Sequence, residues 1–174
     1  DGRKLLKLGG ESIEEEFTSI KPEIPEGKQF KQARGVFVTL TRNKKLRGCI
    51  GIPYPEFAIS QAIYSAAKSS AFSDTRFPPV KEEELKDIRI EISILTIPED
   101  VSSTDEIKVG RDGLMCNYIG YQGLLLPQVA LEYKMNRIQF LEALCNKAGL
   151  PKDNWQNKNF KIKKFSCQIF KEDV

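Results

Sequence analysis

The hexapeptide Leu46-Arg47-Gly48-Cys49-Ile50-Gly51 combines two residue types that could do chemistry, an arginine and a cysteine, with glycines that weaken a strand. Glycine in a strand usually marks a bulge or a place where another group approaches the backbone closely. One interpretation is a bulged hairpin strand with a structural Cys49. The other is a site in which Arg47 binds an anion and lowers the thiol pKa of Cys49, which then acts as a nucleophile. Alternate residues of a strand share a face, so this pairing is geometrically allowed.

A loop before two adjacent prolines holds the second group of candidates, Asp74, Arg76 and Phe77. Asp74 either caps the turn while Phe77 anchors the loop, or it acts with Arg76 to bind a polar ligand or orient a water. A third pair, Gln128 and Glu132, lies four residues apart in a predicted helix and therefore on one helical face. Ordinary surface polarity explains this last pair as well as a binding site does.

Two further motifs have simpler interpretations. The run Gly110-Arg111-Asp112-Gly113 lacks both the Lys-Ser/Thr of a P-loop and the glycine spacing of a dinucleotide-binding loop, so it is interpreted as a turn. The final segment interleaves lysines with aromatic residues, as nucleic-acid binders also do. Phe165 fits the buried alternation of a strand, which favours a solvated lysine face instead. The residues of this segment are Trp155, Lys158, Phe160, Lys161, Lys163, Lys164 and Phe165.

The absence of histidine from all 174 residues excludes several kinds of active site. A Ser-His-Asp triad, a Cys-His dyad and a His-ligated zinc or iron site each require an imidazole. An enzyme with this sequence must move protons with a carboxylate such as Asp74 or Glu132, with a thiol such as Cys49, or with a cofactor or partner. The sequence predicts no bound metal and no cofactor, and it leaves open whether the protein is an enzyme.

Cysteine spacing, hydropathy and charge indicate which cellular compartment and which kinds of partner to expect. The four cysteines, at positions 49, 116, 145 and 167, form no Cys-x-x-Cys motif, so we expect reduced thiols and a cytoplasmic location. No apolar run approaches the ~18 residues of a membrane span, so we expect no membrane contact. Lys plus Arg number 27 and Asp plus Glu 24, giving a net charge of +3 and a pI of about 8.6. This small excess permits a nucleic-acid partner but does not favour one.

Hydrophobic periodicity predicts the elements that must position these residues. Period-two alternation predicts strands at 36–41 and 46–52, joined by a turn at 43–45, and a long strand at 88–95. Helical spacing is clearest at 59–67. The other predicted elements are a weak helix over 6–17, one helical turn at 81–85, helices at 127–133 and 136–148, and a final strand at 162–170. Short strands are also predicted at 107–109, 114–119 and 124–126, with a hairpin turn at Asp112-Gly113 and a next turn framed by Gly120 and Gly123.

The order of these elements predicts the fold class. Antiparallel hairpins at 36–52 and 107–126 favour an α+β fold, with a mostly antiparallel sheet and flanking helices, over a doubly wound parallel fold. A polar linker near residue 100 divides the chain. We therefore expect a larger sub-domain of residues 1–100 plus 155–174 and a smaller sub-domain of residues 101–154.

The hexapeptide at 46–51 resembles the signature of the AMMECR family, named for the Alport syndrome, midface hypoplasia and elliptocytosis chromosomal region. The resemblance covers nearly the whole chain, in ordered blocks at 35–40, 74–80, 91–99, 124–130 and 147–150. It implies a larger and a smaller sub-domain with the recurring motifs facing a cleft between them. The residues it places at that cleft are Arg47, Gly48, Cys49, Gly51, Asp74, Arg76, Phe77, Gln128 and Glu132.

The resemblance implies no single known reaction. It points to a basic role in transcription, replication, repair or translation, or to a modification pathway that involves Memo-type and radical-SAM proteins. We therefore expect a cytosolic binding or modification-pathway module that takes a small polar ligand or a peptide in a cleft lined by residues 46–51. The alternatives are a nucleic-acid-associated factor and a pure interaction adaptor.

Overall fold

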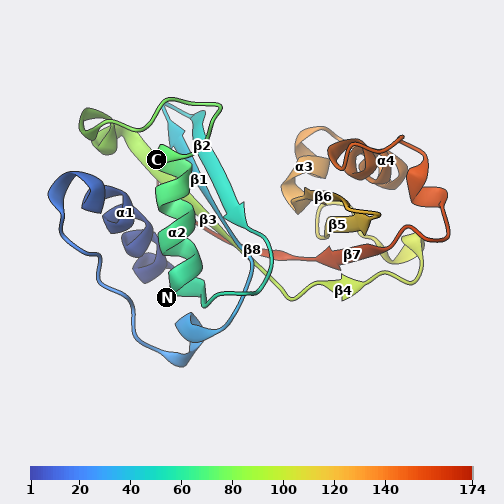
Figure 1. Ribbon diagram of the computed structural model, residues 1–174, viewed down its shortest axis with the longest axis horizontal. Helices are drawn as coiled ribbons and strands as arrows, with labels where there is room; N and C mark the ends of the chain where they lie inside the picture. Colours follow the sequence, from blue (N-terminus) through green and yellow to red (C-terminus); the bar gives the residue numbers. More distant parts are fainter. Residues whose placement is uncertain (174) are drawn as a thin grey trace. The chain divides into compact units, whose positions relative to one another are not determined.

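The chain divides into two units, each with its own four-stranded sheet (Figure 1). The computed structural model describes residues 1–173. Unit 1 comprises Asp1–Leu95 and the residues from Gln168 onward, and unit 2 is Thr96–Cys167. Helices accompany both antiparallel sheets, which confirms the predicted α+β class. The predicted division assigned residues 155–167 to the larger sub-domain, whereas in the structure they belong to unit 2, because the strand formed there pairs within the unit 2 sheet.

The sheet of unit 1 has the strand order β2-β1-β3-β8. Its strands are β1 Val36–Arg42, β2 Lys45–Ile52, β3 Ile88–Leu95 and β8 Cys167–Lys171. β1 pairs antiparallel with both β2 and β3, which confirms the three predicted strands. The turn between β1 and β2 has φ of 52° at Asn43 and 62° at Lys44, the left-handed geometry of a two-residue hairpin.

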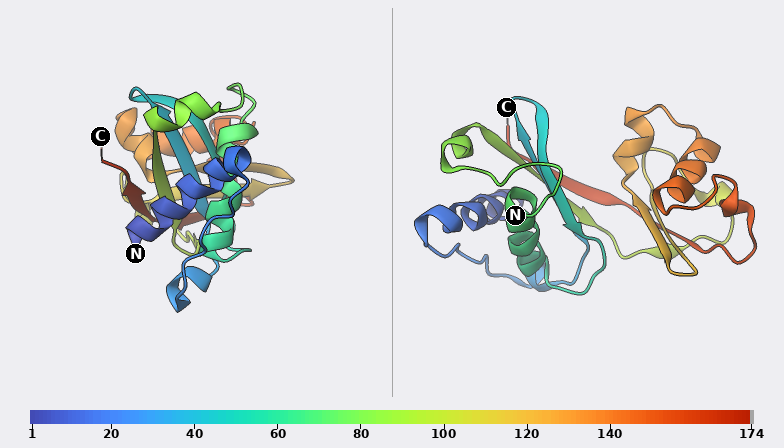
Figure 2. Two further views of the ribbon diagram at one scale, coloured as in Figure 1. Left: turned by 90° about the vertical axis from the view of Figure 1, so that its left-hand side faces the viewer. Right: turned by 45° about the horizontal axis from the view of Figure 1, so that its top comes forward.

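Two helices, α1 (Gly2–Thr18) and α2 (Ile59–Phe72), pack side by side against one face of this sheet (Figures 1 and 2). Because strand side chains alternate between faces, Val36, Val38 and Leu40 of β1 lie fully buried beneath the helices. The opposite face, which we call the helix-free face, receives the other side chains of β1. Within the described residues, no helix combines the length and the hydropathy needed to cross a bilayer.

The helix α1 continues without a break through Gly9 and Gly10, where the sequence predicts a weak start. Burial explains the difference, because Leu5, Leu8 and Ile13 of α1 are all buried in the unit 1 core. Most helical stability in proteins comes from such packing and not from intrinsic propensity. The cost of two helical glycines is therefore offset by the contacts that α1 makes with the sheet.

Unit 2 builds a second core around the sheet β4-β7-β5-β6. Its strands are β4 Glu99–Asp100, β5 Gly113–Tyr118, β6 Tyr121–Leu125 and β7 Ile162–Phe165, and its helices are α3 Pro127–Glu132 and α4 Arg137–Lys147. The predicted capping box of α4 is confirmed. Gln139 N–H donates to Asn136 Oδ1 at 2.8 Å, and Asn136 N–H donates to Gln139 Oε1 at 2.9 Å.

Two predictions about unit 2 are wrong. Residues 107–109 form no strand, so the hairpin predicted around Asp112-Gly113 does not form, whereas the second predicted turn, framed by Gly120 and Gly123, is confirmed between β5 and β6, with φ of 49° at Ile119 and 82° at Gly120. Asp112 is instead buried and accepts the Lys108 N–H at 2.9 Å, and the chain turns at residues 109–111 before β5, which agrees with the interpretation of Gly110–Gly113 as a turn. The final strand predicted at 162–170 breaks at residue 166 into β7 and β8, because its two halves pair in different sheets.

Candidate functional site

The hexapeptide forms most of β2, and its arginine sits in a β-bulge. Gly48 pairs with Leu40 and Leu46 pairs with Thr41, so Arg47 has no partner on β1. This confirms the bulge that the glycines predicted. A bulge interrupts the alternation of side chains, so the reasoning that placed Arg47 on the same face as the cysteine does not extend across it.

Gly48 allows α2 to lie directly on the backbone of β2. A Cβ atom at this position would come within 3.0 Å of the backbone carbonyl of Ser70, on α2. The Ser70 hydroxyl completes the contact, because it donates to the Val38 carbonyl at 2.8 Å and accepts the Ile50 N–H at 2.9 Å. The group that approaches the glycine backbone is therefore a helix of the same unit.

The loop of residues 74–77 holds the backbone of Cys49 from both sides. Asp74 Oδ2 accepts the Cys49 N–H at 2.9 Å, and Arg76 Nη2 donates to the Cys49 carbonyl at 3.2 Å. Asp74 also accepts the Arg76 backbone N–H at 3.1 Å, which is the turn-capping role expected of it, and two guanidinium bonds at 3.0 and 2.7 Å. The structure therefore brings three of the predicted site residues together, and Phe77 joins them with its ring 5.6 Å from the Arg76 guanidinium carbon.

The anion that Arg47 binds is a side chain of the protein, Glu84, in the 3₁₀ helix η2 (Glu82–Asp87). Arg47 Nε and Nη2 each donate to the Glu84 carboxylate at 2.9 Å, and Arg42 Nη1 adds a bond at 3.0 Å. The Arg47 and Glu84 side chains are only 11% and 13% exposed. The predicted pairing of Arg47 with the Cys49 thiol is not formed, and the thiol lies 3.2 Å from Thr39 Oγ1.

The helix-free face carries a polar row that the sequence analysis missed. Thr39 is the register partner of Cys49 on β2 and of Glu91 on β3, so a thiol, a hydroxyl and a carboxylate lie in line across three strands. Counting back from the hairpin turn would have placed Thr39 opposite Gly48, and only the extra residue of the bulge brings Thr39 opposite Cys49. No local pattern could have found Glu84, because the end of β2, the whole of α2 and two connecting segments separate it from Arg47 in the sequence.

The remaining predicted site residues lie in unit 2, on α3. Gln128 is half-buried and Glu132 is exposed. The expectation that they share a site with the β2 residues stays a prediction.

In residues 1–173, no group of three or more Cys, Asp or Glu side chains is arranged to hold a metal ion. Two of the three aromatic residues of the lysine-rich final segment are buried, since Phe160 and Phe165 are 7% and 3% exposed, so these two rings offer no stacking surface to bases.

Hydrogen bonds from arginine lower the pKa values of both carboxylates that hold β2 in place. The Arg76 guanidinium, together with the Cys49 N–H, holds the pKa of Asp74 well below its usual range. The two bonds from Arg47 lower the pKa of Glu84 to about 2. Asp74 is therefore ionised at neutral pH with its oxygens occupied by donors, which makes it a structural carboxylate and not a proton donor.

This arrangement predicts acid sensitivity of unit 1. Both carboxylates have a lower pKa in the folded than in the unfolded state, so their stabilisation is complete above about pH 5 and is lost as the pH falls toward 2. For Glu84 the change from 4.5 to about 2 corresponds to roughly 3 kcal/mol. Urea unfolding at pH 7, 5 and 3 should show a steeper loss in the wild type than in Glu84→Gln. The exposed neighbour Glu82→Gln serves as the control, and parallel pH profiles for wild type and Glu84→Gln would contradict the prediction.

Comparison with known proteins places the chain among proteins of similar length. The model of the AMMECR1 family matches residues 6–170. The chain is 44% identical to protein Mbar_A1807 of Methanosarcina barkeri, over 99% of this chain and 90% of that protein, and 42% identical to protein PYRAB00100 of Pyrococcus abyssi at the same coverage. The crystal structure of uncharacterized protein PH0010 from Pyrococcus horikoshii matches with a TM-score of 0.91 at 40% identity, covering 99% of this chain and 92% of that one.

Proposed function

The chain belongs to the AMMECR1 family, and from this membership and the geometry of β2 we propose that it is a binding module whose site is the surface around Cys49. The ligand is a small polar molecule or a peptide end that carries an anionic group. This surface comprises Cys49 and Thr39 on the helix-free face of the unit 1 sheet and Arg76 beside them.

The observation that carries the proposal is the double attachment of the Cys49 backbone. Its N–H and its carbonyl are both bound by the loop, through Asp74 and Arg76, while its thiol stays partly accessible. A reactive or ligand-contacting group must be held in a fixed geometry by its surroundings, and this loop supplies that support. A cysteine serving only as core filling would need no such attachment.

An anionic ligand could reach the guanidinium of Arg76 but not that of Arg47. The Arg76 side chain is 56% exposed, whereas that of Arg47 is 11% exposed and paired with Glu84. Among the described residues, Arg76 Nη1 makes no hydrogen bond, so one donor edge of the guanidinium remains for a ligand carboxylate or phosphate. The hydroxyl of Thr39 adds a further polar contact next to the thiol.

We also propose that the protein works in the reducing environment of the cytoplasm. All four cysteines are free thiols. Burial raises the pKa of Cys116 to about 11 and that of Cys167 to about 12, and it also raises the pKa of Cys145. A Memo-type or radical-SAM partner stays a prediction from the family resemblance, as does the assignment to a modification pathway.

Alkylation kinetics test this function directly. At pH 7 with limiting iodoacetamide, peptide mapping should show Cys49 modified at least about tenfold faster than Cys167, whose thiol is held protonated. Millimolar inorganic phosphate or acetate should slow the labelling of Cys49, and Arg76→Gln should abolish this protection. The exposed Arg3→Gln is the matched control and should keep it. Equal rates at the two cysteines, or protection that survives Arg76→Gln, would reject the proposed site.

A further inference from the structure

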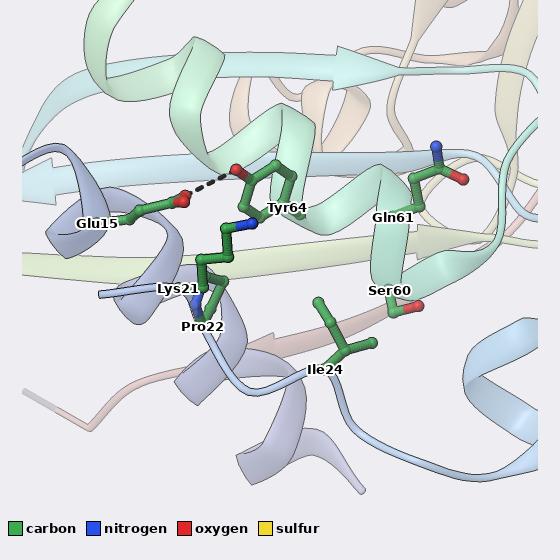
Figure 3. A pocket seen from close by; sticks show the side chains of 7 residues that line it. All are labelled: Glu15, Lys21, Pro22, Ile24, Ser60, Gln61 and Tyr64. Atoms are coloured by element: carbon green, nitrogen blue, oxygen red, sulfur yellow. Dashed lines mark hydrogen bonds between the residues drawn. The ribbon is translucent and has the colours of Figure 1, made fainter. Parts of the chain in front are cut away.

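A hollow of about 380 Å³ lies within unit 1, away from the surface around Cys49 (Figure 3). Its walls are the end of α1, the segment that follows α1, and the first two turns of α2. This volume lies in the lower part of the range of small-molecule sites, about 300–1,000 Å³. The residues that line it are Glu15, Lys21, Pro22, Ile24, Ser60, Gln61 and Tyr64.

One wall of the hollow is fixed by a hydrogen-bonded cluster. The Tyr64 hydroxyl donates to Glu15 Oε2 at 2.7 Å (Figure 3). Lys68 Nζ donates to the same oxygen at 3.2 Å. Lys68 Nζ also lies 5.5 Å from the centroid of the Tyr64 ring. The negative charge of Glu15 is thus already compensated by groups of the protein, and the tyrosine ring is held in place as part of the wall.

The opposite wall carries one positive charge and an apolar surface. Lys21 makes no close ion pair within residues 1–173, although its charge acts on the Glu15 carboxylate, and Figure 3 shows its side chain extending toward Tyr64. Ile24 points from the segment after α1 toward α2, and this isoleucine is 52% exposed although it lies in a concave surface. Together with Pro22, it presents an apolar side to anything that enters.

We propose that this hollow binds a small carboxylic acid with an apolar body. The carboxylate pairs with Lys21 Nζ, and the body packs between Ile24, Pro22 and the ring of Tyr64. An amine of the same size is disfavoured, because Glu15 already accepts two hydrogen bonds and Lys21 repels a second cation. A neutral molecule gains the apolar contacts but not the ion pair.

Three probes of matched shape test the proposal: phenylacetate, 2-phenylethanol and phenethylamine. In ¹H–¹⁵N NMR titrations, phenylacetate should give saturable shifts at the amides of Ile24, Gln61 and Tyr64, and the other two probes should bind more weakly. Lys21→Gln should weaken phenylacetate about threefold to fivefold and leave 2-phenylethanol unchanged, as expected for a partly exposed ion pair. Lys28→Gln, at an exposed lysine outside the hollow, is the control.

A second variant separates the apolar contribution from the charge. Ile24→Ser should weaken all three probes by a similar factor, because it removes contacts that do not depend on the head group. Both lysines and Ile24 are exposed, so the variants should fold normally. Equal binding of the acid and the amine, unchanged phenylacetate affinity in Lys21→Gln, or shifts away from the hollow would each overturn the proposal.

Discussion

Gly48→Ala is expected to lower the free energy of unfolding by about 2–4 kcal/mol, one of the larger effects of any single methyl group in this chain. The added Cβ would come within 3.0 Å of the Ser70 backbone carbonyl, and a backbone group cannot rotate aside as a side chain can. Relief requires α2 to move away from β2, which also stretches the bonds of the Ser70 hydroxyl to Val38 and Ile50. Thermal unfolding should show a loss of roughly 5–15 °C.

The matched control is a glycine whose Cβ has room. At Gly9 of α1 an added Cβ would lie 3.6 Å from Ile90 and Ile92 side-chain atoms, which is an ordinary van der Waals contact. Gly9→Ala should therefore raise the free energy of unfolding by about 0.5–1 kcal/mol, the usual gain from alanine in a helix. If Gly48→Ala proves as stable as the wild type, the close packing of α2 on β2 described above is incorrect.

Glu84→Gln should destabilise the protein at pH 7 by about 3 kcal/mol, the lower end of the range for removing one member of a buried ion pair. The substitution leaves the Arg47 guanidinium, whose side chain is 11% exposed, without a charged partner. It also removes one of the two ion pairs of Arg42. Urea unfolding at neutral pH measures the change.

Asp87→Asn is the matched control for this prediction, since Asp87 lies on the same 3₁₀ helix and contacts the same Arg42. Its ion pair is 3.6 Å long and the two side chains are 37% and 40% exposed, so the expected loss is about 1 kcal/mol or less. A similar loss in both variants would show that burial does not set the strength of the Glu84 interaction.

Much of the fold follows from local patterns. The strands β1 and β3 of unit 1 largely alternate buried and more accessible residues, and α4 begins at a capping box, so these elements can be predicted without long-range information. The extra hairpin of unit 2 predicted at Asp112-Gly113 does not form, although Asp-Gly is a common turn dipeptide, whereas the turn that Gly120 and Gly123 predicted is present between β5 and β6. A buried carboxylate at Asp112 is a tertiary feature that no dipeptide preference reveals.

The site was predictable in its residue types but not in their partners. The glycines of the hexapeptide correctly indicated a bulge and a close approach, yet the approaching group, Ser70, comes from a helix that follows β2. Arg47 was expected to serve a ligand and instead binds Glu84, because the ion pair depends on how η2 packs against the hairpin. Asp74 and Arg76 were correctly grouped since their contact is local, two residues apart.

The order of strands in the unit 1 sheet has a consequence for folding during synthesis. The chain leaves this sheet at the end of β3 and returns as β8, the neighbour of β3, only after the whole of unit 2. Unit 2 is continuous in sequence and can complete its own sheet as it emerges from the ribosome. Until β8 has been synthesised, the backbone N–H and C=O groups on the outer edge of β3 have no strand to pair with. An exposed strand edge of this kind promotes association between chains. The vulnerable period of this protein therefore lasts as long as the translation of its second unit.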